Sequence, residues 1–204
     1  MKEEKSIKKI LEFWFGDLKE NGIPDEKKQK IWWAKDEKTD KYIKNRFENH
    51  LIQAKNEELE SWRITPRGLL AFIILTDQFS RNIYRGNPLA FSQDEMALQG
   101  TLEGINKGMD TKLYAVERVF FHMPLMHSED IEIQSKSINY FSRMEKDYLD
   151  KPDIYILLKG NKKYAEKHYE IIKRFGRFPH RNKVLGRVST AEEIEFLKHP
   201  GSSF

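Results

Sequence analysis

The side chains best suited to acid–base or anion-binding chemistry in this chain of 204 residues are its 6 histidines and its arginines, since it contains no cysteine. Imidazole exchanges protons near neutral pH, and guanidinium groups bind carboxylates and phosphates through paired hydrogen bonds. The informative ones fall on the apolar stripe of a predicted helix, because burying a polar side chain without a partner is costly. Five regions of the sequence meet this description.

The first region directly follows an apolar run, LLAFIIL at 69–75, and contains Asp77, Gln78, Arg81 and Asn82. The spacing of four between Asp77 and Arg81 places both on one helix face, where a carboxylate and a guanidinium can pair. One interpretation is an internal bridge that fixes helix packing. The other is a pair of ligand-binding groups, and the sequence leaves both open.

The second region contains Arg118 and His122, which are also four residues apart, followed by Pro124. The proline removes the backbone donor that would have served the carbonyl of Phe120. A helix bent here could form the wall of a pocket. When the proline is considered by itself, we prefer the simpler interpretation that the helix ends here, with HMPLMHSED at 122–130 as its exit turn.

The third region is His127, which precedes Ser128 and Glu129. We expect His127 at the N-terminus of a helix that Ser128 opens, where oriented N–H groups attract anions. The alternative is a neutral histidine that only caps this helix.

The fourth region consists of Gln134 and His168, each on the apolar stripe of its predicted helix. A buried glutamine or histidine must find hydrogen-bond partners. Each alone is more often a satisfied core residue than a ligand-binding one.

The fifth region is the segment FGRFPHRNKVLGR at 175–187, which contains Arg177, His180, Arg181, Asn182 and Arg187. Phe175 and Phe178 can anchor it, and arginines on an anchored loop suit bidentate binding of carboxylate or phosphate. The alternative is a solvated basic loop. We favour function, because a solvated loop has little need of its aromatic residues.

These side chains must be positioned by helices, because strand signals are nearly absent. We expect helices to begin after Ser6, Pro24-Asp25, Thr39, Thr65-Pro66, Ser92, Asp110-Thr111, Ser128 and Thr190, with one more at about 164–175. Two capping boxes are predicted, Ser92 with Glu95 and Thr190 with Glu193. The helix over Leu69–Leu75 is apolar on every side and is therefore expected to be buried.

The predicted fold is an all-α single domain over 1–204 that contains an irregular basic loop at 176–188. The chain is 39% hydrophobic and 33% charged, which excludes a disordered protein. Without cysteine it has no disulfide scaffold, thiolate nucleophile, zinc finger or iron–sulfur cluster. No apolar stretch approaches the length of a membrane span, so we expect a cytoplasmic protein.

The net charge of +4 is concentrated, since 159–187 holds ten Lys and Arg against two Glu. This pattern favours a local anionic ligand over a long polyanion. No P-loop, GxGxxG, HExxH, GxSxG or EF-hand sequence occurs. We therefore expect neither a metal nor a cofactor.

Three long blocks, PRGLLAFIILTDQFSRNIYRG (66–86), RVFFHMPLMHSED (118–130) and FGRFPHRNKVLGRVSTAEEIEFL (175–197), resemble the bacterial domain of unknown function family 924. Phe13-Trp14-Phe15 and Trp32-Trp33 extend the resemblance to nearly the whole chain. It implies an all-helical, tetratricopeptide-like α-α superhelix of stacked helix hairpins. It implies no activity, substrate or catalytic residue.

We predict that a concave face lined by Arg and His binds a small anionic ligand or a peptide or protein partner. An alternative is an enzyme in which His127 or His180 is the general acid or base and arginines hold the substrate's charge. RNA binding ranks last. The hypothesis of a small-ligand site requires Arg81, His127, His180 and Arg181 to converge on one cleft.

Overall fold

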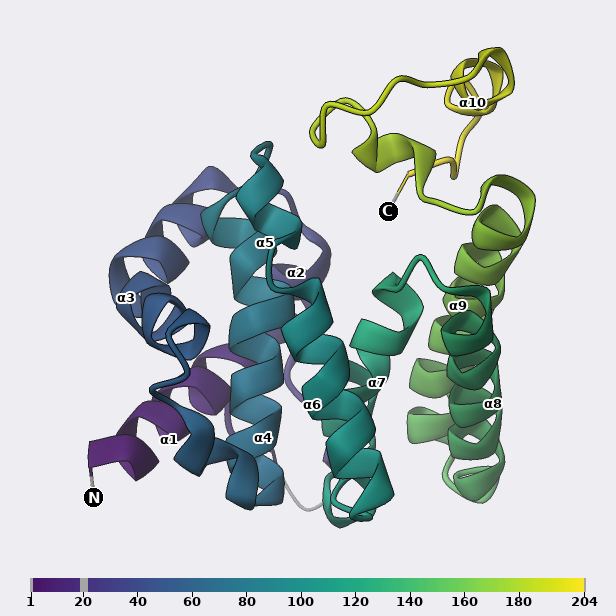
Figure 1. Ribbon diagram of the computed structural model, residues 1–204. Coiled ribbons are helices and arrows are strands. Elements are labelled where there is room, and N and C mark those ends of the chain that lie inside the picture. The colour runs from purple at the N-terminus through teal and green to yellow at the C-terminus, as the bar shows by residue number, and fades with distance from the viewer. Residues whose placement is uncertain (1, 19–21, 204) are drawn as a thin grey trace.

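The computed structural model describes residues 2–18 and 22–203 and contains helices and no strand in those ranges (Figure 1). The α-helices are α1 (Lys2–Phe15), α2 (Glu26–Trp33), α3 (Glu37–Lys55), α4 (Pro66–Ile73), α5 (Ser80–Ile83), α6 (Asp94–Asn106), α7 (Ala115–His127), α8 (Ile131–Asp147), α9 (Pro152–Phe175) and α10 (Ala191–Phe196). The expected all-α class is therefore confirmed.

Several helix boundaries follow the predicted signals. Asp25 caps α2 by accepting from the N–H of Lys28, and Thr65 caps α4 by accepting from Gly68, with Pro66 at the first helical position. Gly176 ends α9 in the left-handed conformation, with φ of 67°. The predicted box of Thr190 and Glu193 opens α10.

Two helices near the N-terminus, α1 and α3, begin earlier in the chain than predicted. α1 begins before Ser6, so Ser6 is a residue within the helix and not its cap. The hydroxyl of Ser6 is 3.0 Å from Nε2 of His50. α3 begins before Thr39, because the Asp36 carboxylate accepts from the N–H groups of Lys38 and Thr39 and takes over the cap.

The predicted capping box of Ser92 and Glu95 is wrong. The hydroxyl of Ser92 donates to the carbonyl of Leu89 and closes a short 3-10 turn, η3 (Pro88–Phe91), so α6 begins after Gln93 without a side-chain cap.

One later helix start and one later cap lie further toward the C-terminus than predicted, while α8 begins at Ile131 as expected. Asp110–Lys112 forms a separate 3-10 turn, and the extended backbone of Leu113 and Tyr114 delays α7 to Ala115. Asp130 rather than Ser128 caps α8, since its carboxylate accepts from the N–H groups at 132 and 133.

α9 starts at Pro152, well before the expected 164, because proline at the first turn of a helix needs no hydrogen-bond partner for nitrogen.

The predicted buried helix is completely enclosed: every residue from Leu69 to Leu75 has no exposed surface. It continues into a π-helical turn, η2 (Ile74–Phe79), and then into α5. Such widened turns occur frequently at functional sites. Here the hydroxyl oxygen of Ser80 lies 2.6 Å from the carbonyl of Thr76, its nearest acceptor, and 3.2 Å from the carbonyl of Ala90, which places the turn against η3.

Helices that follow one another along the chain pack against one another, as α6, α7, α8 and α9 do in turn (Figure 1). The main core joins aromatic side chains from α1, α3, η2 and α7, with Trp14 in edge contact with Phe79 and Phe120. A second, smaller apolar cluster contains Ile171, Ile172 and Phe178. It binds the C-terminal segment to the end of α9.

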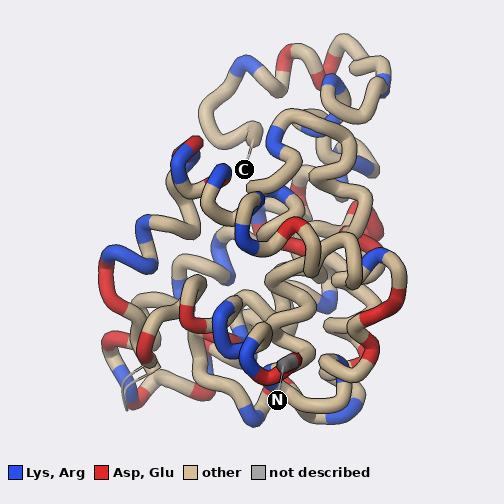
Figure 2. The backbone as a smooth tube through the Cα atoms, turned by 90° about the vertical axis from the view of Figure 1, so that its left-hand side faces the viewer, with Lys and Arg blue, Asp and Glu red and all other residues tan. Residues whose placement is uncertain are grey.

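Charged residues of both signs alternate along the chain in the view of Figure 2. Among the described helices, none has both the length and the apolar character needed to cross a membrane.

Candidate anion-binding site

Two arginines from distant parts of the sequence bind one carboxylate. Arg81 on α5 contacts both oxygens of Asp94 on α6, at 2.7 and 3.1 Å, and Nη1 of Arg181 donates to Oδ2 of Asp94 at 3.2 Å. This bidentate geometry is the one that guanidinium groups use for carboxylate and phosphate. Asp94 thus supplies an internal anion for a paired-arginine site.

Arg181 is held more tightly than an ordinary surface arginine. It lies in η5 (Pro179–Arg181), and its guanidinium lies 4.4 Å from the ring centre of Phe178 and 4.8 Å from that of Phe91. Its side chain is 7% exposed, and its Nε has no hydrogen-bond partner among the described residues. Burial and the nearby Arg81 lower the pKa of Arg181 to about 10, so the guanidinium remains charged at neutral pH.

Asp77 and His127 form the second part of the site. Asp77 is fully buried in η2, and its Oδ1 lies 2.7 Å from Nδ1 of His127, the last residue of α7. Its Oδ2 accepts from Gln78 at 2.6 Å. Burial raises the pKa of the Asp77 carboxyl, but His127 and Arg81 outweigh this effect and hold the pKa well below its usual range.

Nη2 of Arg81 lies 3.5 Å from Oδ1 of Asp77, which is farther than the 2.7 Å between Nη1 of Arg81 and Oδ1 of Asp94. The predicted i, i+4 pair therefore exists, but Asp94 is the closer partner of this arginine. The pair lies in a mixed cluster of charges and is not an isolated bridge.

Two further histidines line the same cluster. The ring of His168 on α9 lies 6.1 Å from that of His127, and the ring of His180 lies 5.5 Å from that of Phe178. Burial and the charge of His127 lower the pKa of His168 to about 3. Burial and the neighbouring Arg181 lower the pKa of His180 to about 4, with smaller effects of Arg81 and His127 in the same direction.

Glu129 positions the C-terminal segment over this cluster. It accepts from the backbone N–H of Phe178 at 2.7 Å and pairs with Arg187 at 2.7 and 3.0 Å. Arg187 also donates to the carbonyl of Phe178. Phe178 is therefore bound through both of its backbone groups, which fixes the residues on either side of it.

The structure accordingly brings together the predicted residues Asp77, Gln78, Arg81, His127, His168, His180 and Arg181. The expected position of His127 was wrong: it ends α7 and does not lie at the N-terminus of α8. That these residues line one cleft, which the small-ligand hypothesis requires, stays a prediction.

Two other predicted residues lie outside the cluster. His122 is buried, with Nε2 3.2 Å from the carboxylate of Asp110, and burial lowers its pKa. Gln134 donates to the carbonyls of Met126 and Ser128 and so binds the end of α7 to α8. The expected exit turn does not begin at Pro124, because α7 continues through the proline to His127. The chain leaves the helix only after His127.

The remaining predicted residues bind other parts of the chain. Asn82 donates to Asp40 on α3, and Asn182 donates to Ser189. Arg177 forms two hydrogen bonds with Glu193 and thereby holds α10. Arg187, as described above, pairs with Glu129.

Sequence reasoning missed three residues that shape the site, namely Asp94, Glu129 and Phe91. Asp94 was overlooked because it lies on an exposed-looking helix start, and its partners are 13 and 87 residues away. Glu129 was noted only as a neighbour of His127. An arginine expected on a buried helix stripe, such as Arg81, nevertheless requires a carboxylate partner, and that signal points to acids such as these.

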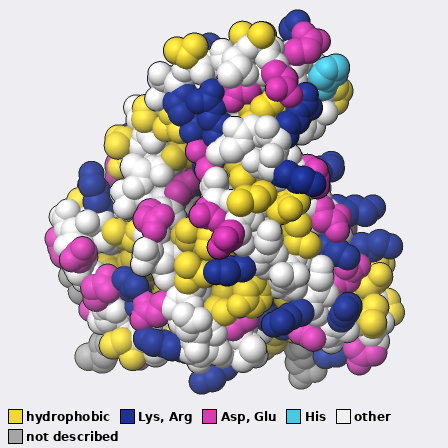
Figure 3. Space-filling view, turned by 45° about the vertical axis from the view of Figure 1, so that its right-hand side comes forward, with side chains coloured by type: hydrophobic (Ala, Val, Ile, Leu, Met, Phe, Trp, Pro, Cys, Tyr) yellow, Lys and Arg dark blue, Asp and Glu magenta, His cyan; other side chains and the backbone are white. Residues whose placement is uncertain are grey.

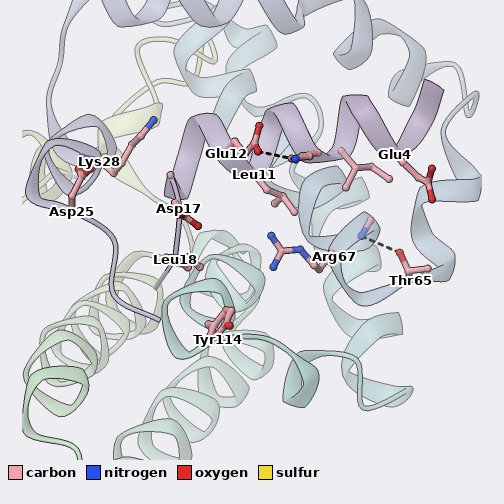
Figure 4. Close-up of a pocket in the computed structure, with 14 residues that line it drawn as sticks. Glu4, Leu11, Glu12, Asp17, Leu18, Asp25, Lys28, Thr65, Arg67 and Tyr114 are labelled. Carbon is pink, nitrogen blue, oxygen red and sulfur yellow. Dashed lines mark hydrogen bonds and ion pairs between the residues drawn. The ribbon is translucent and has the colours of Figure 1, made fainter. Parts of the chain in front are cut away.

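A hollow of about 1090 Å³ lies elsewhere, in a groove between α1 and the beginnings of α4 and α7 (Figure 4). Its charged side chains are of both signs and largely occupied: Lys8 pairs with Glu12, Lys28 donates to the carbonyl of Phe13, and Arg67 pairs with Glu117. Within the described ranges, no group of three His, Asp or Glu side chains could hold a metal ion.

This arrangement is suited to binding an anion and to moving a proton beside it. Two guanidinium groups supply positive charge, and a histidine oriented by a buried carboxylate supplies a group that can exchange a proton. Side-chain exposures of 22% for Arg81 and 16% for His127 leave the cluster partly open to solvent.

The chain belongs to the DUF924 family of bacterial proteins of unknown function, whose family model matches residues 10–201. Among solved structures, it is similar to a protein of unknown function from Agrobacterium tumefaciens, with a TM-score of 0.77 and 32% sequence identity, covering 96% of this chain and 98% of that chain. The curated proteins include no match. The family membership expected from the three sequence blocks is confirmed.

Proposed function

We propose that this protein binds a small anionic molecule, a carboxylate or phosphate, at the cluster of Arg81, Arg181 and His127. The observation that carries the proposal is the state of Arg181. Its guanidinium is buried and lies over two aromatic rings, yet among the described residues it forms one hydrogen bond and its Nε has no partner. An unsatisfied buried donor costs free energy that an anionic ligand would recover.

The charges around the cluster support the same proposal. Burial is the main cause of the lowered pKa values of His168 and His180, and the charges of His127 and Arg181 lower them further, so cationic groups lie near both rings. Asp94 offsets part of this positive charge. Because its side chain is 21% exposed, an anion from solution can compete with its carboxylate for the two arginines.

A small ligand fits better than a macromolecule. On the face in Figure 3, hydrophobic, basic and acidic side chains are interspersed. Strongly exposed apolar residues such as Trp33, Ile156 and Val188 lie on separate elements, and single exposed apolar residues are normal on soluble proteins. Neither observation favours a peptide or protein partner or an RNA.

The test is thermal unfolding of the full chain with phosphate, citrate and acetate. At a ligand concentration of one hundred times Kd, a ligand that binds only the folded state adds about 2.7 kcal/mol and raises Tm by several degrees. We expect at least one anion to give this shift. Arg181→Ala should reduce it by more than half.

Arg174→Ala is the matched control, since Arg174 is an exposed arginine from the same region and pairs with the exposed Glu192. It should respond to anions like the wild type. Equal stabilisation of wild type and Arg181→Ala, or none of the wild type, would refute the proposal.

A second candidate function is acid–base catalysis on the bound anion. The specific observation is the hydrogen bond between Asp77 and His127, which orients a histidine beside the two arginines. Among the described residues, no serine or threonine hydroxyl is bonded to His127, so an attacking group would come from water or from the ligand.

We further propose that the sequential packing of α6 to α9 is part of a tetratricopeptide-like superhelix whose concave side faces the cluster. Neighbour-to-neighbour contacts along the chain support this interpretation. A cytoplasmic location stays a prediction from the sequence.

A further inference from the structure

The hydrogen bond from His127 to Asp77 determines which ring nitrogen can accept a proton. A carboxylate with a strongly lowered pKa is ionised and can only accept, so Nδ1 of His127 must donate. In the neutral ring, Nε2 is then an acceptor. No described residue is hydrogen-bonded to Nε2, and the side chain is 16% exposed.

The site therefore offers two guanidinium donors and one imidazole acceptor. A ligand that satisfies all three must carry a negative oxygen and, next to it, an O–H group. We propose that this site selects oxyanions that carry a hydroxyl beside their charge, such as hydrogen phosphate or a 2-hydroxycarboxylate, over oxyanions of the same shape without one. The inference rests on the proposed anion binding and names its ligand class.

The groups that face His127 come from four parts of the fold. Asp77 and Arg81 approach from η2 and α5, His168 from α9, and His180 and Arg181 from the C-terminal segment. The ligands are compared at about pH 8, above the pKa of about 6.5 that histidine has in model peptides.

Phosphate and sulfate form the matched pair of ligands, because both are tetrahedral dianions at this pH and only phosphate carries a hydrogen. Phosphate can donate to Nε2, whereas a sulfate oxygen would place one lone pair against another. Glycolate and acetate form a second pair, which tests hydroxycarboxylates separately from phosphates. A hydrogen bond to a charged group is worth at least about tenfold in affinity.

The experiment is isothermal titration of the full chain with each of the four anions. We expect the wild type to bind phosphate at least about tenfold more tightly than sulfate, or glycolate at least about tenfold more tightly than acetate. The pair that shows the difference identifies the class of ligand. Equal affinities within both pairs would overturn the inference and leave anion binding intact.

Two variants test the acceptor itself. In His127→Asn, the amide nitrogen can replace Nδ1 as the donor to Asp77, but nothing replaces Nε2. In Asp77→Asn, the amide oxygen can accept from Gln78, which turns the amide nitrogen toward Nδ1 and moves the ring proton to Nε2. Both variants should bind anions with the phosphate preference lost.

The two variants fail in different ways, so one of them remains informative if the other does not fold. A preference for phosphate over sulfate, or for glycolate over acetate, that persists in a folded His127→Asn variant would overturn the inference. Absence of binding of all four anions by the wild type would instead refute the proposed function itself. Arg181→Ala serves as a positional control, because it should weaken both members of a pair.

Discussion

At the scale of single residues, the cluster is unusual because its titratable groups are buried beside cations. His168 is 4% exposed, and its Nδ1 lies 2.7 Å from the carbonyl of Tyr164. Burial and the charge of His127 lower its folded pKa from 6.5 to about 3. In the unfolded chain the same histidine binds its proton near pH 6.5, so folding and protonation oppose each other.

We therefore predict that the free energy of unfolding decreases as the pH falls from about 6 to about 4. For a depressed histidine pKa, the unfolded state binds more protons in this window, and one such group contributes about 1.4 kcal/mol per pH unit. His168→Asn should lower the slope by about this amount. Urea unfolding at several pH values measures it, and identical slopes for variant and wild type would contradict the prediction.

At the scale of elements, close packing of helices holds α5, α6 and α7 in place around the site. A Cβ on Gly104 in α6 would lie 2.4 Å from the Phe121 ring and 2.6 Å from the Leu69 side chain. The neighbouring Thr101 donates to the carbonyl of Phe121 at 2.9 Å. α6 therefore approaches α4 and α7 too closely for any side chain at position 104.

We predict that Gly104→Ala destabilises the protein by about 1 to 3 kcal/mol, the usual cost of overpacking a core. The matched control is Gly160→Ala in α9, where an added Cβ meets nothing within 4 Å. There the better helix propensity of alanine should stabilise by about 0.5 to 1 kcal/mol. Chemical denaturation of both variants measures the difference in sign, and a shift of the same sign in both would contradict the packing argument.

At the scale of the whole molecule, the site depends on how the C-terminal segment is bound to the helices. The segment brings Arg181 to Asp94, which precedes it by 87 residues. Its small apolar cluster is separate from the main core, and Glu129 supplies the polar connection through Phe178 and Arg187. Loss of this connection should loosen the segment without unfolding the main core.

We predict that Glu129→Gln increases amide hydrogen exchange over 177–188 by about tenfold or more, because charge-assisted hydrogen bonds are lost. Exchange in α4 should remain unchanged. Glu132→Gln, an exposed change in the first turn of α8, is the control and should leave both regions protected. Equal exchange in both variants would show that Glu129 does not hold the segment.

Local chemistry made much of the fold predictable. Thr65-Pro66, Asp25 and Gly176 mark helix ends because their side chain or backbone suits only such positions, and the apolar run at 69–75 had to be buried. Ser92 and Ser128 misled for an equally local reason. Each hydroxyl had a competing backbone partner close by in the chain, which sequence pattern alone does not rank.

What the sequence determined by itself was the all-α class, the buried helix and the polar residues that need partners. Helix periodicity and the cost of burying unpaired polar groups act within a few residues, so they can be read along the chain. Only the tertiary structure decided which polar residues meet. Asp94 joins Arg81 and Arg181 across separations of 13 and 87 residues, and His127 meets Asp77 across 50, because helix packing brings these distant positions together.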